Sequence, residues 1–354
     1  MSLSPDDIRA AVAAGVLTEA QAARLLALAD SRRGAREGLS AGDEPFELFK
    51  GFNEIFIVVG LLILSFGWWG AAAIYVGSTL GDTVPRLVQV TLAGAFLLWG
   101  LSEYFVRRRR MVAPAITLSV LFAINATVGL VAGFSHPFMV AQEDYSSLPL
   151  PLGLTVLALG VYWLRFRVPF ALAMIALSVF ATALVLAAER AGTPADIGDV
   201  FLLSADGPFA LITLATGLAV FAVAMGFDMS DPHRVTRRAA NGFWLHVVAA
   251  PALVNTVALT LLAREDATGQ ALLMAFLGLI ALVALVIDRR SFLIAGAGYA
   301  VVLAATVFEA DGGVVSVLAL GAFLLLLGAG WERFRALLLR ALPFLPRDRL
   351  PPAA

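Results

Sequence analysis

Residues 101–117 read LSEYFVRRRRMVAPAIT, where four consecutive arginines interrupt a sequence that is otherwise almost entirely apolar. The chain has 354 residues, 60% of them hydrophobic and 14% charged, and its mean hydropathy is +0.88. Soluble domains are usually about 45–50% apolar and about 25% charged, so this excess cannot be buried in one globular core. The composition therefore indicates a protein whose helices face lipid.

Apolar runs long enough to cross a bilayer, about 20 residues each, occur ten times after residue 50. We predict an all-α, polytopic transmembrane helix bundle with spans at 53–76, 87–105, 112–134, 149–164, 169–188, 208–227, 242–263, 270–287, 292–308 and 313–331. The first of these runs follows a long polar segment, so it is expected to be a retained anchor and not a cleaved signal peptide.

The positions of the basic residues predict the direction in which each span crosses. With a cytoplasmic N-terminus and ten spans, the inner segments hold 22 of the 25 lysines and arginines, and the outer loops hold only Arg86, Arg190 and Arg264. This asymmetry follows the positive-inside rule. The strongest topogenic signals are Arg107, Arg108, Arg109, Arg110, Arg165, Arg167, Arg289 and Arg290.

The arginine run at 107–110 is predicted to end the second span in the cytoplasm. One arginine at a helix centre costs roughly 2.5–3.5 kcal/mol, so four in a row cannot be carried into the hydrocarbon. Such a run also attracts anionic lipid headgroups by about 1 kcal/mol per residue, and a specific lipid site is the alternative use. Nucleic acid is excluded as a partner because no aromatic residues interleave with the run and no basic soluble domain surrounds it.

The chain divides into four predicted parts. Residues 1–30 form a cytoplasmic helical pair, with Pro5 in the first turn, Gly15 at the left-handed end of the first helix, and Thr18 with Gln21 as a capping box for the second. Residues 31–45 are a polar linker, 46–331 are the transmembrane domain, and 332–354 are a cytoplasmic tail. The tail is expected to contain an amphipathic helix that ends at Pro343. The apolar seam of the helical pair is too small to be stable alone, so residues 1–30 are expected to dock on a protein partner, on another copy of the chain or on the membrane domain.

Two inner turns resemble one another in sequence. RFRVPFALA (165–173) and DRRSFLIAG (288–296) share the pattern Arg-x-x-Phe-x-x-Ala, and each lies between two predicted spans. A repeated helical hairpin would produce this pattern, and so would chance in a sequence of low diversity.

Few polar side chains fall inside the predicted spans. Asn125, Asn255 and Thr256 could line a substrate cavity, or they could join helices through hydrogen bonds worth about 0.6 kcal/mol each. The charged residues Glu54 and Glu103, and also His246, are predicted near the cytoplasmic ends. An ion pump or proton relay needs an ionisable residue within the membrane, so that class is disfavoured.

The outer loop SHPFMVAQEDYSSL (135–148) is chemically the most varied, and its candidate residues are His136, Glu143, Asp144 and Tyr145. A metal could bind there, but one imidazole without fixed ligand spacing is more typical of an ordered surface loop. No metal site, cofactor or catalytic residue is predicted, because cysteine is absent and no hydrolase, phosphate-loop or dinucleotide motif occurs.

The segments GVLTEAQAARLL (15–26), QEDYSSLPLPLG (142–153) and W-x-x-x-R-x-x-L-L (331–339) resemble those of a family of bacterial polytopic membrane proteins of unknown function. The resemblance implies a short N-terminal helical segment before many spans, in the bacterial inner membrane. It implies no activity. We therefore expect a non-enzymatic scaffold or envelope-associated subunit, and the alternative is a permease for a neutral or lipid-like substrate lined by Asn125 and Asn255.

Overall fold

A computed structural model of the chain describes residues 5–18, 21–22, 25, 28, 52–78, 81–137, 139–142, 144–232, 234, 236–264, 266–307, 318, 321–322, 324–346 and 349–351. These residues form helices and turns, with no strand among them. The predicted all-α fold is confirmed.

Eight helices in the described part of the chain are long and apolar enough to cross a membrane. They are α3 (Phe52–Gly77), α4 (Thr83–Ser102), α5 (Val112–Phe134), α6 (Pro149–Phe166), α7 (Pro169–Ala191), α8 (Phe209–Ser230), α9 (Arg237–Leu262) and α10 (Ala267–Ile287). The ninth predicted span corresponds to α11 (Ser291–Val307), which has 17 residues. Of the tenth, 313–331, the structure describes residues 318, 321–322 and 324–331.

Three shorter helices complete the described elements. The π-helix η1 (Glu103–Arg108) continues α4, the 3-10 helix η2 (Ile197–Val200) lies in the α7–α8 loop, and α13 (Trp331–Ala341) follows the last predicted span. Because η1 ends at Arg108, the helix stops inside the arginine run, as the cost of burying guanidinium groups predicts.

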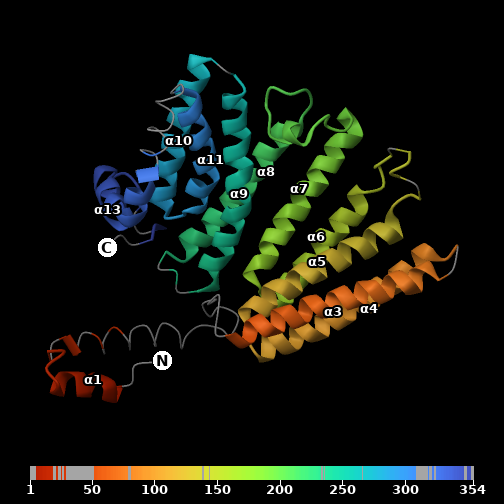
Figure 1. Cartoon of the computed structure of the whole chain (residues 1–354), viewed down its shortest axis with the longest axis horizontal. Helices are drawn as coiled ribbons and strands as arrows, with labels where there is room; N and C mark the ends of the chain where they lie inside the picture. The colour runs from red at the N-terminus through yellow and green to blue at the C-terminus, as the bar shows by residue number, and fades with distance from the viewer. Residues whose placement is uncertain are drawn as a thin grey trace.

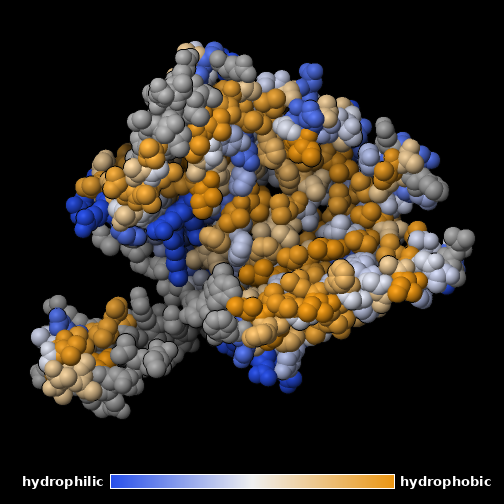
Figure 2. Space-filling model, viewed as in Figure 1, coloured by the Kyte–Doolittle hydropathy of each residue, from blue (hydrophilic) through white to orange (hydrophobic). Residues whose placement is uncertain are grey.

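The helices fan out from one end of the bundle, and their direction changes gradually from α10 to α3 (Figure 1). One hydrophobic core joins α3 to α7 around Leu118 and Tyr162, and a second joins α8 to α13 around Val254 and Leu273. A small third cluster at Ala176, Ala224 and Leu245 connects the two. Apolar residues cover the sides of the helices and hydrophilic residues gather at their ends (Figure 2), as expected for helices surrounded by lipid.

Four turns at the predicted inner ends of the helices share an unusual backbone conformation. Arg110, Arg167, Arg234 and Asp288 have φ of 52°, 52°, 53° and 57°, the left-handed region that few non-glycine residues adopt. Arg167 and Asp288 each cap a helix directly before the next hairpin helix begins. Both turns of the shared sequence pattern thus contain a left-handed residue, but this residue is the arginine of the pattern at Arg167 and stands one position before that arginine at Asp288.

The N-terminal unit is described in part. Its helix α1 (Pro5–Ala13) is followed by a turn that contains Gly15, whose φ is +72°. Thr18 and Gln21 exchange the two capping-box hydrogen bonds, at 3.0 and 3.3 Å. These predictions are confirmed, whereas the linker at 31–45 lies outside the described residues.

Helices α4 and α5 approach closely because glycines stand at their contact. A Cβ at Gly129 would lie 2.8 Å from the Thr91 Cβ and closer still to the Thr91 hydroxyl, whereas one at Gly133 would lie 3.5 Å from Val88. Both glycines belong to one GxxxG pattern, yet only Gly129 has no room for a side chain.

We expect Gly129→Ala to destabilise the protein and Gly133→Ala to leave it unchanged or more stable. Each substitution replaces a glycine that weakens its helix, so this gain is the same at both positions. Overpacking costs about 1–3 kcal/mol and is expected at Gly129 alone. Thermal unfolding in detergent, followed by tryptophan fluorescence, measures the difference. Equal melting temperatures for the two variants would contradict the close α4–α5 contact.

Candidate functional site

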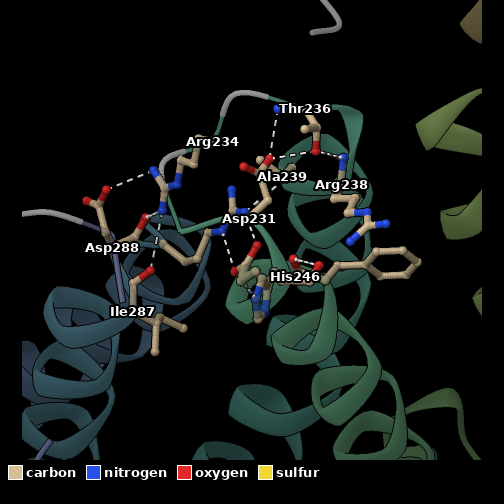
Figure 3. Close-up of polar contacts among 12 residues, drawn as sticks. Asp231, Arg234, Thr236, Arg238, Ala239, His246, Ile287 and Asp288 are labelled. Carbon is tan, nitrogen blue, oxygen red and sulfur yellow. Dashed lines mark hydrogen bonds and ion pairs between the residues drawn. The ribbon is translucent and has the colours of Figure 1, made fainter. Parts of the chain in front are cut away.

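Three ionisable side chains meet inside the bundle, and we name Asp228, His246 and Arg289 the inner ion cluster. Asp228 lies near the end of α8, His246 in the third turn of α9, and Arg289 between α10 and α11. All three are buried, with 6%, 0% and 6% of their surfaces exposed. Figure 3 shows the polar contacts around His246 and the neighbouring turn.

Both oxygens of the Asp228 carboxylate are occupied. Oδ2 accepts hydrogen bonds from His246 Nε2 and from Arg289 Nε, each at 2.9 Å, and Oδ1 accepts from Arg289 Nη2. The same Arg289 Nη2 donates to the main-chain carbonyl of Ala239 at 2.9 Å. This paired arrangement is what permits a carboxylate and a guanidinium to leave water together.

The position of His246 determines which of its ring nitrogens donates to Asp228. A carboxylate can only accept, so the hydrogen that joins Nε2 to Asp228 belongs to the histidine. Nδ1 is buried and has no hydrogen-bond partner among the described residues. The ring lies edge-on to Phe221 and Phe292, at 5.4 and 5.7 Å between ring centres. The imidazole thus contacts a carboxylate through Nε2 and packs between aromatic side chains.

Two local features bring the cluster together. Gly242 faces Asp228 so closely that a Cβ would overlap the Asp228 carboxylate and lie 3.2 Å from the Ala224 carbonyl. The α8–α9 turn is held by Asp231, which accepts from the Thr236 main chain and hydroxyl at 2.9 and 2.8 Å. Thr236 in turn caps α9. In the pattern Gly242-x-x-x-His246, the glycine leaves space for the Asp228 carboxylate and the histidine, on the same helix face, donates to it.

A second group of contacts joins neighbouring turns to the tail. Arg234 pairs with Asp288 Oδ2 at 2.8 Å and donates to the Asp288 main-chain carbonyl, and Trp331 Nε1 donates to Asp288 Oδ1 at 2.7 Å. Burial, reinforced by the nearby Arg289, lowers the pKa of Arg234, and Asp288 opposes this effect. The buried Arg335 donates to the Leu285 carbonyl at 3.1 Å. These bonds attach α13 to the inner end of α10.

One sequence prediction for this region needs a correction. His246 is predicted at the beginning of a span, but α9 begins at Arg237, five residues before the predicted 242, and His246 is fully buried. Arg289, one of the predicted topogenic arginines, is buried against Asp228, while its neighbour Arg290 is exposed and lies 5.2 Å from the Trp331 ring. Asp228 is not among the residues that the sequence singles out. The signal that could have identified it is an acidic residue at the end of a span, where arginines dominate.

The two predicted asparagines are not brought together. Asn125 is buried, donates to the Thr91 carbonyl at 2.7 Å, and borders a cavity of about 30 Å³, the space of about one water. Asn255 is half-buried and belongs to the other half of the bundle, and Thr256 is buried with its hydroxyl bonded to the Ala252 carbonyl of its own helix. Asn125 lines the cavity of about 30 Å³, and Asn255 is not among the residues of that lining.

The outer loop is ordered by its own hydrogen bonds. Ser147 Oγ accepts from the His136 main chain at 2.9 Å, and Asp144 accepts from the Ser146 main chain at 3.1 Å. The hydrogen bonds from Ser146 lower the pKa of Asp144 below its usual value. Tyr145 is half-buried, and Glu143 lies outside the described residues. Among the residues that are described, no group of three acidic or histidine side chains could hold a metal.

The other predicted topogenic arginines occupy the inner turns. Arg107 and Arg165 both contact Glu103, at 3.2 and 2.7 Å, Arg167 lies 4.8 Å from the Trp163 ring, and Arg109 donates to the Tyr104 hydroxyl at 3.2 Å. Arg108 and Arg110 are exposed. The turns that carry these residues thus approach one another.

Comparison with known proteins identifies no relative: no family model, no curated protein and no solved structure matches the chain. The resemblance to the polytopic family of unknown function therefore stays a prediction, and the site must be interpreted from its own geometry.

We expect Arg289→Gln to destabilise the protein by about 3–5 kcal/mol, because it leaves the buried Asp228 carboxylate without its cation. Arg290→Gln, in the same turn, should cost less than about 1 kcal/mol, since it removes only an exposed cation–ring contact. Thermal unfolding in detergent measures both.

The double variant Asp228→Asn/Arg289→Gln provides the control for this prediction. It should recover part of the loss, because no buried carboxylate remains to be neutralised. If the two substitutions are instead additive, the inner ion cluster is not a coupled unit.

Proposed function

We propose that this chain is a multi-pass protein of the bacterial cytoplasmic membrane, with both termini in the cytoplasm, and that it acts without catalysis as a scaffold or envelope-associated subunit. The eight long apolar helices make it a candidate membrane protein. The finer assignment is supported by the arginine asymmetry and by the nature of the buried charges.

The observation that carries the proposal is that both oxygens of the Asp228 carboxylate are engaged in hydrogen bonds. A carboxylate that binds and releases a transported cation needs an oxygen that is open to the ion, but here both oxygens accept hydrogen bonds from His246 and Arg289. Arg289 is itself bonded to the Ala239 carbonyl. The inner ion cluster is therefore better suited to joining α8, α9 and the α10–α11 turn than to conducting an ion.

A scaffold also needs a surface for its partner, and residues 1–30 supply a candidate. Val16, Leu25 and Leu28 of this unit expose 75%, 39% and 51% of their surfaces. Exposed apolar side chains on a small helical unit favour docking on another protein. The predicted cytoplasmic side of the membrane is where that partner would be found.

Liposomes containing the purified protein should dissipate an imposed proton gradient no faster than protein-free liposomes, because the cluster offers no exchangeable carboxylate. A pH-sensitive dye inside the vesicles measures the rate. The Asp228→Asn variant should behave like the natural chain. Proton entry that requires Asp228 would overturn the scaffold proposal in favour of an ion-coupled transporter.

The orientation can be tested with single cysteines, since the chain contains none. Gln142→Cys, in the outer loop, should react with a membrane-impermeant maleimide on intact spheroplasts. Arg108→Cys, in the arginine run, should react only after the membrane is opened. Both positions are exposed, so accessibility within the protein is matched. Labelling of Arg108→Cys on intact spheroplasts would reverse the proposed topology.

A further inference from the structure

A pocket of about 310 Å³ lies where the predicted inner turns converge, and we name it the arginine pocket. Its lining contains five arginines and two apolar residues: Arg107, Arg110, Arg165, Arg167, Arg237, Val106 and Phe166. Among these lining residues none is acidic. The five arginines come from three separate segments, namely the α4–α5 turn, the α6–α7 turn and the first residue of α9.

The fold holds these guanidinium groups near one another in spite of their like charge. Glu103 contacts both Arg107 and Arg165, so one carboxylate is shared between two cations. Arg237 donates to the main-chain carbonyl of Arg167 at 3.5 Å, which ties α9 to the α6–α7 turn. Guanidinium groups that line one pocket repel one another even where they have other partners, and an added anion reduces that repulsion.

Two features of the fold hold the walls of the pocket in place: the burial of its apolar residues and the backbone conformation of its turns. Val106 and Phe166 form apolar parts of its lining and are 6% and 3% exposed, so they belong to the core. Arg110 and Arg167 both adopt φ of 52°, a conformation that directs the chain sharply at each turn. The cations are therefore positioned by the core and the turns, while four of the five remain exposed to a ligand.

We propose that the arginine pocket binds a phosphate group that carries two negative charges, as in a phosphate monoester. Guanidinium groups bind phosphate oxygens through paired hydrogen bonds, and several together prefer a dianion to a phosphodiester with one charge. The volume is at the lower end of the range for ligand sites, which suits a small headgroup or a free phosphate compound. The scaffold proposal requires no such ligand, so the two proposals succeed or fail separately.

The test uses the full-length protein in detergent at about 0.15 M salt, where nonspecific charge attraction is screened beyond about 8 Å. Dioctanoyl phosphatidic acid is the lipid monoester, dioctanoyl phosphatidylglycerol is the diester of single charge, and inorganic phosphate is the soluble probe. Saturable binding of phosphatidic acid is expected, at least tenfold tighter than that of phosphatidylglycerol. Inorganic phosphate that binds as tightly as phosphatidic acid indicates a soluble ligand, and weaker binding indicates a lipid headgroup. Both results support the phosphate site.

Matched variants separate the pocket from the general surface charge. Arg107→Gln/Arg110→Gln removes two lining residues, and Arg108→Gln/Arg109→Gln removes the same charge from the same run without touching the lining. The first variant should weaken binding of phosphatidic acid at least tenfold and the second less than twofold. Equal weakening in the two variants, or no saturable binding to the natural chain, would overturn the proposal.

A second pair repeats the comparison on another helix. Arg237→Gln removes a lining residue at the start of α9, and Arg238→Gln removes its neighbour, which does not line the pocket. Only the first should weaken binding. This pair decides the question if the 107/110 variant does not fold, as its melting temperature would reveal. Equal binding by the 237 and 238 variants would then overturn the proposal.

Discussion

Guanidinium groups determine where the helices of this protein end. Each arginine in the hydrocarbon costs roughly 2.5–3.5 kcal/mol unless it is paired, so a chain this rich in arginine can cross the membrane only if those residues gather at the turns. The structure follows that constraint at Arg108, where the helix that includes η1 ends inside the arginine run. Three further turns, at Arg167, Arg234 and Asp288, have the same left-handed backbone and carry basic residues.

Arg289 lies at one of these turns but is buried, and this exception is informative. Val168 and Arg289 each follow the left-handed residue of an inner turn, and both are buried. At the first turn the buried position is filled by an apolar side chain. At the second it is filled by a cation that Asp228 neutralises and the Ala239 carbonyl completes. The same hairpin geometry can thus accept either residue, provided that a charged residue brings its partner with it.

This exception also shows how far the sequence could predict the structure. The spans were predictable because hydropathy and arginine position act locally: α5 occupies 112–134 as predicted, and α3 differs from its predicted bounds by one residue at each end. The inner ion cluster depends instead on contacts between residues far apart in the chain. Asp228 and Arg289 are 61 positions apart, and α8 reaches α9 at Asp228 because Gly242 leaves room for the carboxylate. No periodicity in the sequence encodes that distance.

The start of α9 was also misplaced for a physical reason. Hydropathy places the start of the span at 242, because RRAAN (237–241) contains two arginines and an asparagine. The helix instead begins five residues earlier, at Arg237, because Thr236 caps it. Thr236 is in turn hydrogen-bonded to Asp231. Caps act through single hydrogen bonds, which an average over a window of residues cannot register. His246, which is predicted near the cytoplasmic end of a span, therefore lies in the interior and belongs to the inner ion cluster.

The first turns of α9 connect the two polar sites of the inner end. Arg237 lines the arginine pocket, Ala239 accepts from Arg289, and His246 completes the inner ion cluster. Both sites contain guanidinium groups, but these groups are buried in the inner ion cluster and mostly exposed in the arginine pocket. This difference in burial determines whether they join helices or can bind an added anion. Arg289 is enclosed and its neighbours satisfy it, so it can only hold helices together. Four of the pocket arginines are exposed and converge from different turns, so an added anion can reduce their repulsion. A cation that the core has already neutralised is a structural element, and cations that the fold gathers at the surface define a site for binding.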